Sequence, residues 1–190
     1  MSSDRSTLTM TGYHGCDANN VPSIKAENFR CSKGEHHWLG EGTYFFTVGF
    51  SDPSIDAQRW AIAESWDKKT HSRRYTKFCV LKAAINPCNP LDMTQDLGKA
   101  KVNHAREEIA KRLRPKEDYD DNSIIRWLAK HYAFDVLVQD FFIKMTRERI
   151  LRIESRFPNV RVICVRNPDS AIDKTLISVT YTALVPTTYS

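Results

Sequence analysis

The glycines of this chain are concentrated in one part of the sequence. Six of the seven fall within residues 12 to 49, in or near two short segments, Tyr13-His14-Gly15 and 38–46. Glycine allows tight turns and a close approach of the backbone to a neighbour or a ligand. A polar ring after a strand-like run, and later a Gly-x-Gly turn leading into Tyr-Phe-Phe, suits a site for a flat ligand. The glycine-poor remainder is expected to be scaffold.

Length and composition limit the protein class. The 190 residues fit one domain, 1–190, and 41% apolar content is enough for an ordinary core. No run approaches the roughly 18 to 20 apolar residues needed to span a bilayer. The first six residues lack the profile of a signal peptide. We therefore expect a cytoplasmic protein without a membrane partner.

The five cysteines predict free thiols rather than a disulfide framework. They are odd in number, widely spaced and never in a C-x-x-C pair. His36 and His37 lie near Cys31, but no second ligand pair has the spacing of a structural zinc site. We expect no metal.

Positive charge is clustered in two stretches. The net charge is +5, and residues 68–77 hold five Lys or Arg and no acid. Such a cluster suits a phosphate-rich partner. The candidate acceptor-binding residues in it are Lys68, Lys69, Arg73 and Arg74. A second basic stretch contains Arg147, Arg149, Arg152 and Arg156. The alternative is a solvated surface balanced by the acidic residues 117–121.

The order of predicted elements favours an α+β fold. Strands are expected at 7–14, 43–47, 75–85, 134–138, 160–165 and 176–185. Helices are expected from Asn20 toward Phe29, from Asp52 over four turns, and at 103–114 and 122–131. Strands and helices do not alternate regularly, which disfavours a doubly wound sheet. A Rossmann or P-loop site is disfavoured because the third glycine, the downstream acid and a Gly-Lys-Ser/Thr motif are missing.

Six motifs resemble, in order and spacing, the PARP-like (diphtheria-toxin type) ADP-ribosyltransferases. Two are the glycine segments, and the third is the helical Ala57-Gln58-Arg59-Trp60-Ala61. The other three resemble a bacterial and fungal branch of that superfamily and lie at 89–94, 134–138 and 165–168. The resemblance covers roughly residues 10 to 172. It implies split, mostly antiparallel sheets with flanking helices around an NAD cleft.

The resemblance also implies roles for individual residues. His14 would bond the adenosine ribose, the Gly15 backbone would read the nicotinamide amide, and Tyr44 and Trp60 would pack on the two faces of the nicotinamide ring. Aromatic faces suit a flat ring. The remaining residues assigned to the NAD-binding set are Cys16, which we interpret as a small filler, together with Gly42, Thr43 and Ala57.

One departure from the family pattern concerns the catalytic glutamate. Relatives place a Glu, sometimes a Gln, at the position of Val162, where it grips the nicotinamide ribose and stabilises developing positive charge. Valine can do neither. The candidate replacements are Glu154, Glu148 and Asp140, or the uncharged Gln139. Ala57 likewise stands where many relatives carry a hydroxyl group.

Two functional hypotheses remain. The first is a mono-ADP-ribosyltransferase using NAD as co-substrate, with RNA or DNA slightly favoured over protein as acceptor. The resemblance implies a bacterial toxin or phage-defence effector, for which a neutralising antitoxin would be expected. The second is a non-catalytic module that binds ADP-ribose, NAD or nucleic acid through a degenerate site.

Overall fold

The computed structural model describes residues 9–33, 37–112 and 119–186. Its strands are β1 (Met10–Asp17), β2 (Thr43–Thr47), β3 (Trp66–Asp67), β4 (Ser72–Arg73), β5 (Lys77–Ile85), β6 (Pro90–Asp92), β7 (Val136–Phe141), β8 (Val160–Val165) and β9 (Ser178–Leu184). Its α-helices are α1 (Val21–Glu27), α2 (Pro53–Glu64), α3 (Asp96–Ala110), α4 (Asp121–Tyr132), α5 (Thr146–Ile150) and α6 (Pro168–Ala171). Two short 3₁₀ turns cover Ala18–Asn20 and Lys174–Leu176.

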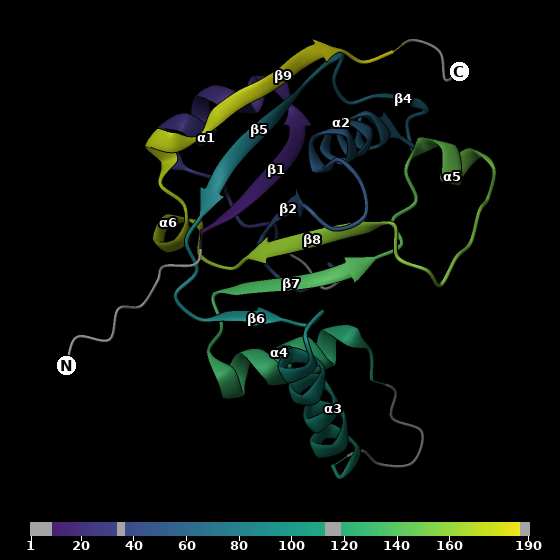
Figure 1. Ribbon diagram of the computed structural model, residues 1–190. Coiled ribbons are helices and arrows are strands. Elements are labelled where there is room, and N and C mark those ends of the chain that lie inside the picture. Colours follow the sequence, from purple (N-terminus) through teal and green to yellow (C-terminus); the bar gives the residue numbers. More distant parts are fainter. Residues whose placement is uncertain (1–8, 34–36, 113–118, 187–190) are drawn as a thin grey trace.

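A mixed, mostly antiparallel sheet of seven strands organises the molecule (Figure 1). The strand order is β6-β7-β8-β2-β1-β5-β9. Among these neighbours β6 and β7 run parallel, and the other pairs are antiparallel. Strands β3 and β4 form a separate two-stranded hairpin beyond α2. The α+β class is therefore confirmed. The sheet is continuous, however, where separate sheets were expected.

The pairing between β1 and β2 is the shortest in the sheet. These strands share one register pair, Tyr13 with Phe46, whereas β1 pairs with β5 over eight residues. Beyond that pair the two strands diverge. The strands β1-β5-β9 and β6-β7-β8-β2 are thus joined by one backbone register pair, and a hydrogen bond of 2.8 Å from Thr47 Oγ1 to the Thr11 carbonyl adds to it.

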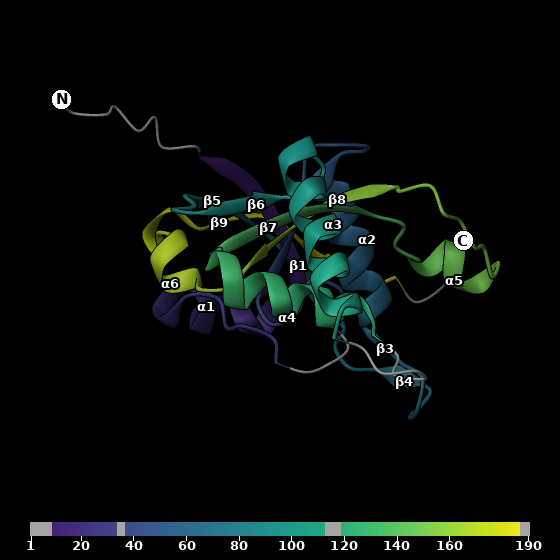
Figure 2. The ribbon, with the colours of Figure 1, turned by 90° about the horizontal axis from the view of Figure 1, so that it is seen from below.

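The core lies on both faces of the sheet, because side chains alternate along each strand. Phe46 packs in one cluster with residues of α2 and α4, and its neighbour Phe45 packs in another with Ile24 of α1. The predicted inward face of β5, with Cys79, Leu81, Ala83 and Ile85, belongs to the second cluster, as expected. Figure 2 shows α1 and α6 at one end of the molecule and α5 at the other.

Element existence was predicted better than element bounds. Strand β1 continues three residues beyond His14 because β5 supplies partners as far as Asp17. Helix α3 begins at Asp96 rather than 103, and the predicted residues 113 and 114 lie outside the described part of the chain. Strand β7 lies at Val136–Phe141 rather than 134–138. The sequence reasoning missed β6, α5 and the β3-β4 hairpin, which are too short for periodicity to mark.

Candidate functional site

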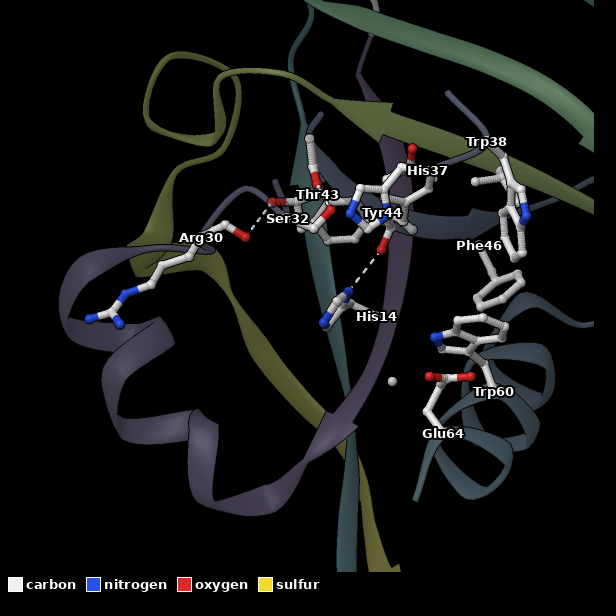
Figure 3. A pocket seen from close by; sticks show the side chains of 14 residues that line it. His14, Arg30, Ser32, His37, Trp38, Thr43, Tyr44, Phe46, Trp60 and Glu64 are labelled. Carbon is white, nitrogen blue, oxygen red and sulfur yellow. Dashed lines mark hydrogen bonds between the residues drawn. The ribbon is translucent and has the colours of Figure 1, made fainter. Parts of the chain in front are cut away.

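A cavity of about 390 Å³ opens where β1 and β2 diverge (Figure 3). This volume lies within the range of small-molecule sites. The residues lining it come from β1, the segment before β2, β2 itself, α2 and β8. They are His14, Gly15, Arg30, Ser32, His37, Trp38, Gly42, Thr43, Tyr44, Phe45, Phe46, Trp60, Glu64 and Val162. The sequence-predicted His14, Gly15, Gly42, Thr43, Tyr44 and Trp60 are therefore brought together.

His14 bridges the gap in the sheet. Its Nδ1–H donates to the carbonyl of Tyr44 at 2.8 Å, as the dashed line in Figure 3 shows. Burial lowers the pKa of the imidazole, and the hydrogen bond to Tyr44 offsets only part of that effect. The ring is then neutral near pH 7, with Nδ1 protonated. Its Nε2 remains an acceptor and can bond a ligand hydroxyl group.

Tyr44 offers its ring rather than its hydroxyl group. The hydroxyl donates to the carbonyl of Gly40 at 2.6 Å and accepts from the backbone N–H of Leu39 at 3.0 Å. Burial raises the pKa of the phenol far above its ordinary value. Gly40 has a φ of 75°, a conformation that glycine adopts at little cost. The Gly-x-Gly turn thus fixes the orientation of the tyrosine ring.

Three aromatic rings of the cavity lining come from different segments: Trp38 precedes β2, Tyr44 lies on β2 and Trp60 lies on α2. Trp38 lies 5.5 Å from Trp60, 6.3 Å from Tyr44 and 5.7 Å from Phe141, as centroid distances. The expected pair of Tyr44 and Trp60 is therefore supplemented by Trp38, which the site prediction did not include. Phe46 also lines the cavity. The signal for both was present, because they are the first and last residues of the second glycine segment.

Glu64 is a lining carboxylate that the sequence reasoning missed. It follows Trp60 by four residues on α2, so the two side chains share one face of the helix, and Figure 3 shows them adjacent. Its Oε1 accepts from Nη2 of Arg149 at 2.9 Å. Arg149 also lies over the Trp60 ring, 5.6 Å from the centroid. The helical spacing Trp-x-x-x-Glu could have identified Glu64.

Close packing explains why a glycine stands at position 15. A Cβ built there would lie 1.9 Å from the carbonyl oxygen of Ala57, so β1 passes directly against α2. Ala57 is fully buried and does not line the cavity. Cys16 does not line it either, since its Sγ lies 3.7 Å from that of Cys79 on β5. The side chains of Ala57 and Cys16 thus pack within the protein, and their assignment to the NAD-binding set stays a prediction.

Val162 lines the cavity, where the resemblance would place the catalytic glutamate. It is 2% exposed and lies opposite Phe46 on β2 and Gln139 on β7. None of the four proposed replacements lines the cavity. Asp140 is held by Arg161 in two hydrogen bonds of 2.7 and 3.1 Å. Glu154 is exposed beyond α5 and pairs with Lys144.

A second cavity, of about 700 Å³, adjoins the first. Trp38, Trp60 and Glu64 line both. Of the predicted acceptor-binding residues, Lys68, Lys69 and Arg74 line the second cavity, and Arg73 does not. Arg73 instead donates to the hydroxyl of Ser65 at 2.8 Å and to the carbonyl of Pro186.

The described residues offer neither a metal-binding cluster nor a membrane-spanning helix. No group of three or more His, Cys, Asp or Glu side chains in that part of the chain could hold a metal ion. Within the same residues, every helix is too short or too polar to span a bilayer. All five cysteines are free thiols.

Comparison with known proteins gives one distant similarity. No family model matches the chain. The chain is 33% identical over 82 residues to the uncharacterized protein MJ0359 of Methanocaldococcus jannaschii. The match covers 42% of this chain and 34% of the archaeal protein, so it spans about a third of that protein's length. Its printed name assigns no activity.

Proposed function

We propose that this chain is an NAD-dependent mono-ADP-ribosyltransferase. The observation that carries the proposal is the hydrogen bond from His14 to the Tyr44 carbonyl across the gap in the sheet. It joins the two glycine segments at one cavity and leaves Nε2 of a neutral imidazole as an acceptor. A ribose hydroxyl group is the kind of donor that this nitrogen can bind.

The chemistry of the lining suits the other parts of NAD. The rings of Tyr44, Trp38 and Trp60 offer apolar faces to the nicotinamide. Arg30 lies at the far end of the cavity from α2, where its guanidinium pairs with Glu27 and would exchange that partner for the phosphates (Figure 3). Val162 lies at the cavity wall, which agrees with the register on which the resemblance depends.

The acceptor is proposed to be a macromolecule, with nucleic acid favoured over protein because the adjoining cavity is basic. The proposed setting is a bacterial toxin or phage-defence effector with a neutralising antitoxin. That setting depends on the family resemblance alone.

Labelled NAD tests the proposal. The purified chain is incubated with NAD labelled in the adenosine half, together with cellular RNA or protein, and nicotinamide release and label transfer are measured. Tyr44→Ala is expected to reduce both by about 100-fold or more, since a ring that positions the reacting group is removed. Tyr44→Phe keeps the ring and is expected to retain more activity. Tyr181→Ala, on the outer strand β9, is the control and should behave like the unmodified chain.

A second candidate is a non-catalytic module that binds NAD or ADP-ribose. Val162 favours it, because the wall carries an apolar side chain where the family has its glutamate. Calorimetry with NAD and ADP-ribose separates the two hypotheses. Tight binding of both, without nicotinamide release in any extract, would establish the binding module and overturn the enzyme.

A further inference from the structure

The second cavity is formed by two basic stretches that lie far apart in the sequence. The β3-β4 hairpin region contributes Lys68, Lys69 and Arg74. Helix α5 contributes Arg149, and Lys144 lies two residues before that helix. Contacts between α2 and α5 bring the two stretches together. The lining contains these five cations and two carboxylates, Glu64 and Asp67. The cavity therefore has an excess of positive charge.

Two of these cations are available for a ligand. Arg149 is engaged with Glu64, Arg74 lies 3.5 Å from Asp67, and Lys144 pairs with Glu154. Lys68 and Lys69 are exposed and form no ion pair with another described residue. The carboxylate of Asp67 accepts from the backbone N–H of Lys69 at 2.8 Å, which fixes the turn that carries both lysines.

Tryptophans lie beside this charge. Trp66 is 38% exposed and lines the second cavity, and Trp38 and Trp60 line it where it meets the first. Cations that hold phosphates, next to an exposed aromatic face on which a base can stack, are the usual means of binding single-stranded nucleic acid. A base in a duplex is stacked on its neighbours and cannot stack on a protein ring without being flipped out.

The described part of the acidic stretch does not line the second cavity. Of residues 117–121, the structure describes 119 to 121. Asp120 accepts from the backbone N–H of Ser123 at 2.9 Å and caps α4, and none of these three residues lines the cavity.

We propose that the second cavity is the acceptor site, and that it binds single-stranded nucleic acid with phosphates on Lys68 and Lys69 and a base against Trp66. As an acceptor site this rests on the proposed transferase function. The junction at Trp38, Trp60 and Glu64 would place the bound strand beside the NAD cavity.

The test measures binding without NAD, so that its failure is distinct from a failure of catalysis. A fluorescent single-stranded 12-mer is titrated with the full chain by anisotropy at several salt concentrations. Lys68→Gln combined with Lys69→Gln is expected to weaken binding roughly tenfold near 0.15 M salt and to lower the salt slope by about 1.4, the value for two phosphate contacts on a single strand. The control, Lys25→Gln with Lys82→Gln, removes the same charge from exposed sites on α1 and β5 and should change the slope little.

Stacking is tested separately at Trp66. Trp66→Ala is expected to weaken binding about fivefold or more, the usual loss for one stacked base, and Trp66→Phe to recover most of it. Quenching of tryptophan fluorescence by the oligonucleotide should be smaller in both variants.

Three outcomes would overturn the acceptor-site proposal. They are no binding of the 12-mer, binding of a duplex of equal length as tight as that of the single strand, and binding of a polyglutamate peptide in place of the oligonucleotide. The last outcome would favour a protein acceptor. Single-strand binding with the expected slopes supports the site even if nicotinamide is never released, in which case it is the transferase function that fails.

Discussion

At the scale of single residues, the resemblance would place a carboxylate at Val162, and the carboxylate that lines the first cavity comes instead from a helix. Sequence proximity to β8 suggested Glu154, but that side chain does not line the first cavity. Glu64 reaches the cavity from α2, one helical turn beyond Trp60. Among the described residues that line the first cavity, it is the one carboxylate. We therefore infer that Glu64 supplies negative charge at the junction of the two cavities.

Replacing Glu64 by Gln tests this role. Because the side chain keeps its shape but loses its charge, transfer of ADP-ribose is expected to fall about 100-fold, with little change in NAD affinity. Radiolabel transfer and calorimetry measure the two effects. Glu154→Gln should leave transfer unchanged. The opposite pattern, with Glu154→Gln inactive and Glu64→Gln active, would return the role to Glu154.

His14 gives a prediction about pH. Burial lowers the pKa of His14 below its ordinary value of 6.5. The imidazole is therefore harder to protonate in the folded protein than in the unfolded chain. The unfolded chain takes up the proton first as pH falls, so this contribution to stability is complete above about pH 6.5 and declines below it. Protonation also removes the Nε2 acceptor, so NAD affinity should fall with decreasing pH.

Calorimetry with NAD and urea unfolding, both between pH 5 and 8, measure these two effects. In His14→Asn the affinity should be weaker and nearly independent of pH in this range. An equally steep pH dependence in that variant would show that another group is responsible.

At the scale of elements, β2 supplies more lining residues to the first cavity than any other element, and α2 is the helix that lines both cavities. Helix α2 contributes Trp60 and Glu64, and its Ala57 carbonyl lies against Gly15 of β1. The later motifs have structural roles instead. Asp135 accepts from the backbone N–H groups of Cys88 and Asn89 at 2.6 and 2.9 Å, and so ties β6 to the segment before β7. These motifs thus stabilise the strands β6 and β7, and β7 pairs with β8.

The start of α2 is an accessible place to perturb the site from a distance. Asp52 accepts from the backbone N–H groups of Ser54 and Ile55 at 2.8 and 3.3 Å. Asp52→Ala is expected to lower the free energy of unfolding by about 1 kcal/mol, the usual cost of a lost N-cap. Asp52→Asn keeps an acceptor and should cost less. Urea denaturation measures both, and equal losses in the two variants would exclude a capping role.

At the scale of the whole molecule, the fold joins groups that the chain keeps far apart. The narrow connection between β1 and β2 opens the first cavity, and the packing of α5 on α2 closes the second. Arg149 connects the two regions, since it donates to Glu64 and to the carbonyl of Ala63. The proposed co-substrate and acceptor sites thus share one wall built from α2.

The sequence by itself determined the α+β class, most helices and long strands, the N-cap of α2 and the two glycine segments. These follow from local periodicity, turn residues and capping, which act over a few neighbours. Only the tertiary structure decided that Trp38, Phe46 and Glu64 line the cavity, that Cys16 and Ala57 do not, and that the basic stretches meet. Those facts depend on strand register and helix packing between distant segments, which local patterns do not specify.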